Sequence, residues 1–112
     1  MWFVFPQIAG LGQSPTSVRF AISSLAEAQA YLAHPVLGPR LKDCATLTLG
    51  VDGRTAGDVF GSIDAMKFRS SLTLFAKADL EERVFERCLK KYFAGAPDPA
   101  TLAMLERLEN RR

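Results

Sequence analysis

The sequence predicts an all-α fold: one compact domain of about five to six helices behind an extended apolar N-terminal segment. From residue 24 to residue 105, apolar residues recur at helical spacing between helix-capping patterns. No stretch alternates apolar and polar residues long enough to build a sheet. The 112 residues, 48% of them hydrophobic, suffice for one core. We therefore divide the domain (1–112) into an extended or loop segment (1–20), a helical core (24–105) and a charged tail (106–112) that we expect to fray.

Capping patterns mark where the first helices begin. Ser24-Leu-Ala-Glu27 is a capping box, in which the serine and glutamate side chains satisfy free backbone amides reciprocally. The helix that it opens should end at His34, the single histidine, which fits a cap better than a general base. A second helix is expected over about 36–49, and Thr55-Ala-Gly-Asp58 should open a short third one.

The segment 62–78 is the expected core helix, because at about 100° per residue it carries two apolar arcs. One arc is Ala65, Phe68, Leu72 and Phe75, and the other is Ile63, Met66 and Leu74. A further helix is expected over about 80–93, capped by Asp79 and ended by Gly95. The last helix should open at Asp98-Pro99.

Composition and motifs exclude several classes of protein. A net charge of +2, with cations and anions interspersed, argues against nucleic-acid binding. Cys44 and Cys88 have no metal-ligand spacing and fit reduced, buried thiols. No metal set, nucleotide loop or cofactor motif is recognisable, so we expect no cofactor and no metal. The apolar start lacks the basic region of a signal peptide, and no stretch reaches the roughly 20 apolar residues of a membrane span. We therefore expect a cytoplasmic protein.

Two clusters are candidate ligand sites. In the first, Lys67, Arg69 and Ser70 would hold a phosphate or carboxylate. Its structural alternative pairs Asp64 with Lys67 and directs Arg69 to the carboxyl end of a helix. This alternative is favoured.

The second cluster lies at the N-terminus. Here Trp2 and Phe5 would wall a pocket for a flat ring, and the Gln7 amide would bind the ring's edge. The structural alternative, again favoured, makes this segment part of the core.

Several segments together resemble a known family. They are WFVFPQIAGLG (2–12), YLAHPVLGPRL (31–41), VFG (59–61), KFRSSLTLF (67–75), FAG (93–95) and DPATL (98–102). In order and in register, they resemble the bacterial family called domain of unknown function 1810, whose members are mainly α-helical and are sometimes labelled calpastatin. Nothing in these residues supports that label.

Members of this family usually carry a further amphipathic helix before the segment that begins at Trp2. By this resemblance the chain is expected to be a truncated member whose apolar segment 2–7 has lost its cover. We accordingly expect residues 1–112 alone to be marginally stable, aggregation-prone or homodimeric through that segment.

Two functions remain open. The first is a binding module without catalysis, with a pocket between the 2–7 segment and the 62–78 helix. The second is an enzyme or binder of ADP-ribose or NAD-type nucleotides, on a loose similarity to the NADAR group of hydrolases. That similarity implies that Lys67 and Arg69 hold phosphates, that Trp2 or Phe5 stacks a base, and that Asp64 is the acid–base candidate.

Overall fold

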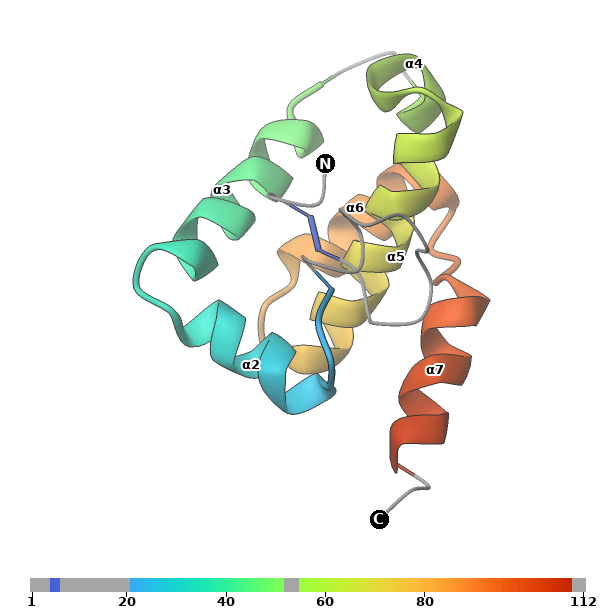
Figure 1. Ribbon diagram of the computed structural model, residues 1–112. Helices are drawn as coiled ribbons and strands as arrows, with labels where there is room; N and C mark the ends of the chain where they lie inside the picture. The colour runs from blue at the N-terminus through green and yellow to red at the C-terminus, as the bar shows by residue number, and fades with distance from the viewer. Residues whose placement is uncertain (1–4, 7–20, 52–54, 110–112) are drawn as a thin grey trace.

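The computed structural model describes residues 5–6, 21–51 and 55–109, and every regular element within them is an α-helix (Figure 1). The helices are α2 (Leu25–Ala33), α3 (Leu37–Leu49), α4 (Ala56–Phe60), α5 (Ser62–Ala78), α6 (Val84–Phe93) and α7 (Pro99–Glu109). The predicted all-α class is confirmed.

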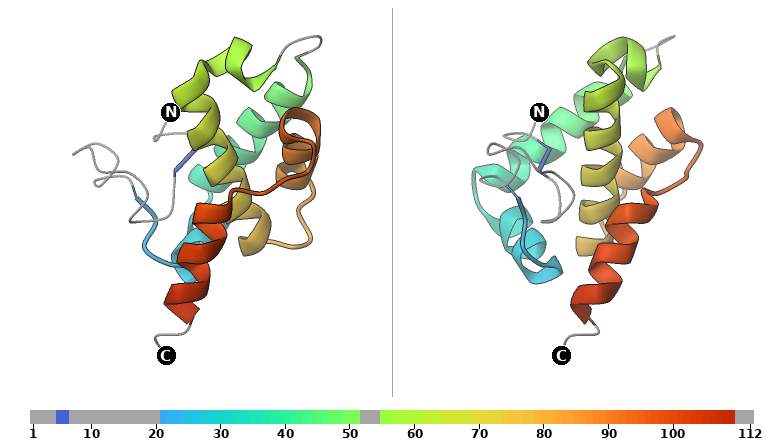
Figure 2. Two further views of the ribbon diagram at one scale, coloured as in Figure 1. Left: turned by 90° about the vertical axis from the view of Figure 1, so that its right-hand side faces the viewer. Right: turned by 45° about the vertical axis from the view of Figure 1, so that its right-hand side comes forward.

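Helix α5 is the centre of the domain, as predicted. It packs against α2, α4, α6 and α7, and α3 closes the structure by packing on α2 and α6 (Figure 1). Helix α6 runs antiparallel to α5, and α7 then lies along the carboxyl-terminal half of α5 (Figure 2). The layers on different sides of α5 are thus built by segments far apart in the sequence.

The buried face of α5 follows the first predicted arc. Phe68, Leu72 and Phe75 have no exposed surface. The Phe68 ring is surrounded by other aromatic rings, with centroid distances of 4.8 to 6.2 Å: Phe5, Phe60, Tyr92 and Phe93. Each such contact adds to the ordinary gain from apolar burial, so Phe68 is the centre of the core.

The second predicted arc is only partly correct. Leu74 is fully buried, but Ile63 is 69% exposed and Met66 is 71% exposed. The physical reason is that α7 begins beside the middle of α5, so it covers the later turns and leaves this face of the first two turns open (Figure 2). Periodicity predicts which residues share a face, but not how far a neighbouring helix reaches along it.

Most of the predicted caps form. The Thr55 hydroxyl accepts from the Asp58 amide, and the Asp58 carboxylate accepts from the Thr55 amide, each at 3.1 Å. The Ser24 hydroxyl accepts from the Glu27 amide at 3.1 Å, but the Glu27 carboxylate accepts from the amide and hydroxyl of Ser23. The reciprocal half of that capping box is therefore shifted by one residue.

His34 also acts as a cap. Its Nδ1 accepts hydrogen bonds from the amides of Val36 and Leu37, both at 3.1 Å, and so supports the first turn of α3. Neutral imidazole with the proton on Nε2 is the form that can do this. The predicted role of His34 is confirmed.

One predicted boundary is wrong. Helix α6 begins at Val84 rather than near Leu80, because the Asp79 carboxylate accepts from the Glu81 amide and closes a turn instead of a helix. Helix α7 continues to Glu109, with Leu105 and Leu108 packed on the core, and the expected fraying of residues 106–112 stays a prediction. The last residues of the predicted tail lie outside the described part of the chain.

Gly38 allows α2 and α3 to meet closely. A Cβ atom at this position would lie 2.0 Å from the carbonyl oxygen of Leu32, which is backbone and cannot rotate away. Glycine is therefore required where α3 crosses the end of α2. Gly57 in α4 is different, because a Cβ atom there would lie 3.7 Å from the Thr55 hydroxyl oxygen, an ordinary van der Waals distance.

We expect Gly38→Ala to lower the free energy of unfolding by more than about 2 kcal/mol, because the α2–α3 corner must open to admit the methyl group. Chemical denaturation followed by circular dichroism measures this. The matched control is Gly57→Ala, which should be neutral or slightly stabilising, since alanine favours a helix. Equal losses in both variants would contradict the close-approach account.

Candidate functional site

Arg69 and Ser70, two of the polar side chains of α5 that the sequence singles out, are turned toward the chain between α6 and α7. The Arg69 Nε donates to the Ala96 carbonyl at 3.0 Å, and one terminal nitrogen donates to the Pro97 carbonyl at 3.1 Å. The guanidinium carbon also lies 5.7 Å from the centre of the Phe93 ring. Arg69 thus reaches the backbone just beyond the carboxyl end of α6, as the structural alternative predicted.

Ser70 and Thr73 continue this contact toward α7. The Ser70 hydroxyl lies 3.2 Å from the Asp98 carboxylate and 3.0 Å from the Met66 carbonyl. The Thr73 hydroxyl donates to the Arg69 carbonyl and accepts from the Asp98 amide, both at 2.8 Å. These bonds join the start of α7 to the middle of α5.

Asp98 is the N-cap that the sequence predicts for α7. Its carboxylate accepts from the Thr101 amide at 3.0 Å and from the Thr101 hydroxyl at 2.6 Å, in addition to its contact with Ser70. Thr101 is fully buried and Ser70 is nearly so. One carboxylate oxygen therefore satisfies several polar groups that would be costly to bury alone. We call Arg69, Ser70, Thr73 and Asp98 the α5–α7 clamp.

The other residues that the sequence analysis proposed for a ligand site do not belong to this clamp. Asp64 and Lys67 form the predicted pair, 3.8 Å apart, and both side chains are partly exposed. Phe5 is buried, with its ring edge-on to Phe68, which favours the core interpretation. Trp2 and Gln7 lie outside the described residues, so their proposed part in a pocket stays a prediction.

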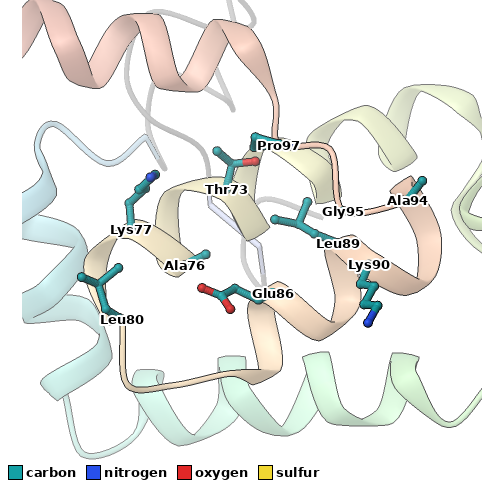
Figure 3. Close-up of a pocket in the computed structure, with 10 residues that line it drawn as sticks. All are labelled: Thr73, Ala76, Lys77, Leu80, Glu86, Leu89, Lys90, Ala94, Gly95 and Pro97. Atoms are coloured by element: carbon teal, nitrogen blue, oxygen red, sulfur yellow. The ribbon is translucent and has the colours of Figure 1, made fainter.

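The structure does contain a hollow, but in a place that the sequence analysis did not predict. It has a volume of about 470 Å³ and opens between α5, α6 and the chain that follows α6 (Figure 3). The described residues that line it are Thr73, Ala76, Lys77, Leu80, Glu86, Leu89, Lys90, Ala94, Gly95 and Pro97. We call it the α5–α6 hollow.

Charged groups lie at the rim of this hollow and apolar groups at its base. Figure 3 shows Ala76 and Leu89 between the two helices, with the Glu86 carboxylate extending toward Ala76. The amino groups of Lys77 and Lys90 point away from the base. Such a site suits a ligand with an apolar body, which the rim charges could orient.

A second, smaller hollow adjoins the first. It has a volume of about 360 Å³ and lies beside α7, with Leu25, Lys77, Leu80, Leu102, Leu105 and Glu106 as lining residues. We call it the α7 hollow. Leu80 belongs to both hollows and is 69% exposed, although leucine is usually buried. The exposure of Leu80 indicates this site, but it follows from the tertiary structure and cannot be deduced from the sequence.

The cysteines occupy structural positions. Both are free, Cys44 half-buried and Cys88 buried. The Cys88 thiol donates to the Ala45 carbonyl at 3.3 Å and lies 3.6 Å from the Thr48 hydroxyl. Burial raises the pKa of the Cys88 thiol, and the Thr48 hydrogen bond and the Lys91 charge offset only part of that effect.

Within the described ranges, no three His, Cys, Asp or Glu side chains gather as a metal site would require. In that same part of the chain, no helix is long and apolar enough to cross a bilayer.

We expect Asp98→Ala to lower the free energy of unfolding by about 2–4 kcal/mol, because it removes a helix cap and leaves Ser70 and Thr101 without their shared acceptor. Thermal or chemical denaturation measures the loss. Asp43→Ala, on the exposed face of α3, is the control and should change stability by less than about 0.5 kcal/mol. A similarly small change for Asp98→Ala would show that the clamp contributes little.

We expect a thiol reagent to modify Cys44 in the folded protein while Cys88 reacts only on unfolding, since the thiolate is the reactive form. Reaction with a chromogenic disulfide reagent, with Cys44→Ser as control, measures this. Because the Cys88 pKa is raised in the folded state, the unfolded chain releases that proton first, and stability should fall as the pH rises above the ordinary thiol value. Rapid reaction of the folded Cys44→Ser variant with the thiol reagent would contradict the expected protection of Cys88.

Comparison with known proteins gives a family but no activity. No curated protein matches the chain. Its fold is similar to the crystal structure of the conserved hypothetical protein Rv1873 from Mycobacterium tuberculosis, with a TM-score of 0.92 and 51% sequence identity over 94% of this chain and 75% of that one. The family model described as "Protein of unknown function (DUF1810)" matches residues 1–105 and does not support the expected truncation. The chain therefore belongs to the DUF1810 family of proteins of unknown function.

Proposed function

We propose that this domain is a binding module without a catalytic centre, and that the α5–α6 hollow is its ligand site. The observation that carries the proposal is the composition of that hollow, in which Ala76 and Leu89 form an apolar base and charged side chains stand at the rim. A pocket of several hundred Å³ with this arrangement is typical of sites for organic ligands.

The polar groups of α5 support this choice of site. Arg69 and Ser70, the predicted anion ligands, already bond to the chain at 96–98. Releasing them for a ligand would leave the Ala96 and Pro97 carbonyls and the Asp98 carboxylate with fewer hydrogen bonds. A small anion is therefore better placed against Lys77 or Lys90, at the rim of the hollow, than against the clamp.

No observation on the described residues favours the alternative, an ADP-ribose or NAD-type hydrolase. Asp64, its acid–base candidate, is paired with Lys67 and half-exposed, which is unlike the dry surroundings that tune a catalytic carboxyl. That alternative stays a prediction, tied to Trp2 and the other residues outside the described part of the chain.

We expect the folded protein to bind 8-anilinonaphthalene-1-sulfonate, a probe with an apolar body and one anionic group, with a rise in its fluorescence. Ala76→Phe should weaken this binding about tenfold by filling the base of the hollow. The matched control is Ala30→Phe on exposed α2, which should leave the affinity unchanged. Each variant must unfold cooperatively, because the probe also binds partly folded chains. Absence of binding to the folded protein, or equal binding by Ala76→Phe, would refute the proposal.

A further inference from the structure

The α5–α6 hollow is one part of a longer trough. It shares Lys77 and Leu80 with the α7 hollow. On its other side it shares Glu86 and Lys90 with a third hollow, whose described lining is Arg83, Glu86, Arg87 and Lys90 along α6. The three hollows therefore adjoin one another from the outer face of α6, across the α5–α6 hollow, to α7, and we call the set the trough.

Leu80 stands between the two hollows with apolar bases. Its side chain is 69% exposed in the free protein. On the far side, Leu102 and Leu105 of α7 and Leu25 of α2 supply further apolar surface. A small ligand in either hollow alone would leave Leu80 in water, whereas an elongated ligand that crosses the trough would cover it.

The rim of the trough is basic. Four of its described side chains are cations, namely Lys77, Arg83, Arg87 and Lys90, and two are anions, namely Glu86 and Glu106. One anion and one cation of the rim already pair with each other, since Glu86 lies 3.5 Å from Arg83. The surplus of positive charge is therefore placed along α6 and at Lys77, on both sides of the α5–α6 hollow.

Resting on the function proposed above, we propose that the trough binds an amphipathic α-helix of a partner protein, with acidic residues beside its apolar face. Apolar side chains three or four residues apart would enter the α5–α6 and α7 hollows on either side of Leu80, the usual mode of a helix in a groove. Its Asp and Glu residues would face the cations of the rim. The occupant is thus matched to the trough in apolar content and in charge.

The experiment is a selection of helical peptides from a displayed random library against the whole protein, followed by fluorescence anisotropy of the best peptide. The expected peptides carry Leu, Ile, Met or Phe at i and i+3 or i+4, with Asp or Glu beside them. Ala76→Phe and the double variant Lys77→Glu/Lys90→Glu should each weaken binding about tenfold or more. Raising the salt concentration should also weaken it, because exposed charges are screened. The matched control, Arg40→Glu on exposed α3, should bind normally.

Each other outcome overturns the inference. No enrichment, enrichment of neutral or basic peptides, or equal binding by Ala76→Phe would show that the trough does not take an acidic helix. Trough-dependent binding of phosphatidylglycerol vesicles without peptide enrichment would assign the surface to a membrane instead. If 8-anilinonaphthalene-1-sulfonate still binds and Ala76→Phe still weakens it, this inference fails while the proposed function stands. If the probe also fails to bind, both fail.

Discussion

The hydrogen bonds between α5 and residues 96–98 are the constraint on which the position of α7 depends. After α6, the chain turns through left-handed conformations at Ala94 and Gly95, and both amides donate to the Leu89 carbonyl. The next two carbonyls, of the exposed residues Ala96 and Pro97, accept hydrogen bonds from Arg69. A cation beside the carboxyl end of α6 is also favoured by the helix dipole. The clamp thus fixes both the end of α6 and the start of α7.

The shape of the proposed ligand site depends on the same constraint. Pro97 and Gly95 border the α5–α6 hollow on the side where the clamp holds the chain, and α7 supplies one wall of the adjoining hollow. In the proposed binding function, Arg69 and Ser70 of α5 would therefore act indirectly, because they hold the chain that shapes the hollow. This explains why a central helix contains more polar groups than its burial alone would suggest.

Local signals in the sequence are sufficient for most of the helices, because caps and turn glycines act within a few residues of themselves. The Thr55–Asp58 capping box, the His34 cap and the Asp98 N-cap all form where the pattern predicts. The errors arise where tertiary contacts decide. Asp79 can cap a turn or a helix equally well, and the exposure of Met66 depends on where α7 begins. Neither can be read from neighbouring residues.

The site was less predictable than the fold for the same reason. Its lining comes from α5, α6 and the chain after α6, in residues that lie up to about two dozen positions apart in the sequence. In the sequence, the two helices look like ordinary amphipathic helices. The central claim is that the α5–α7 clamp is a structural connection. Native-state hydrogen exchange tests it most directly, at the amides of Asp98 and Thr101, which donate to Thr73 and Asp98. The account predicts protection as strong as that of the core amides of α5. Exchange of both amides at the rate of an exposed loop, in an otherwise protected domain, would contradict it.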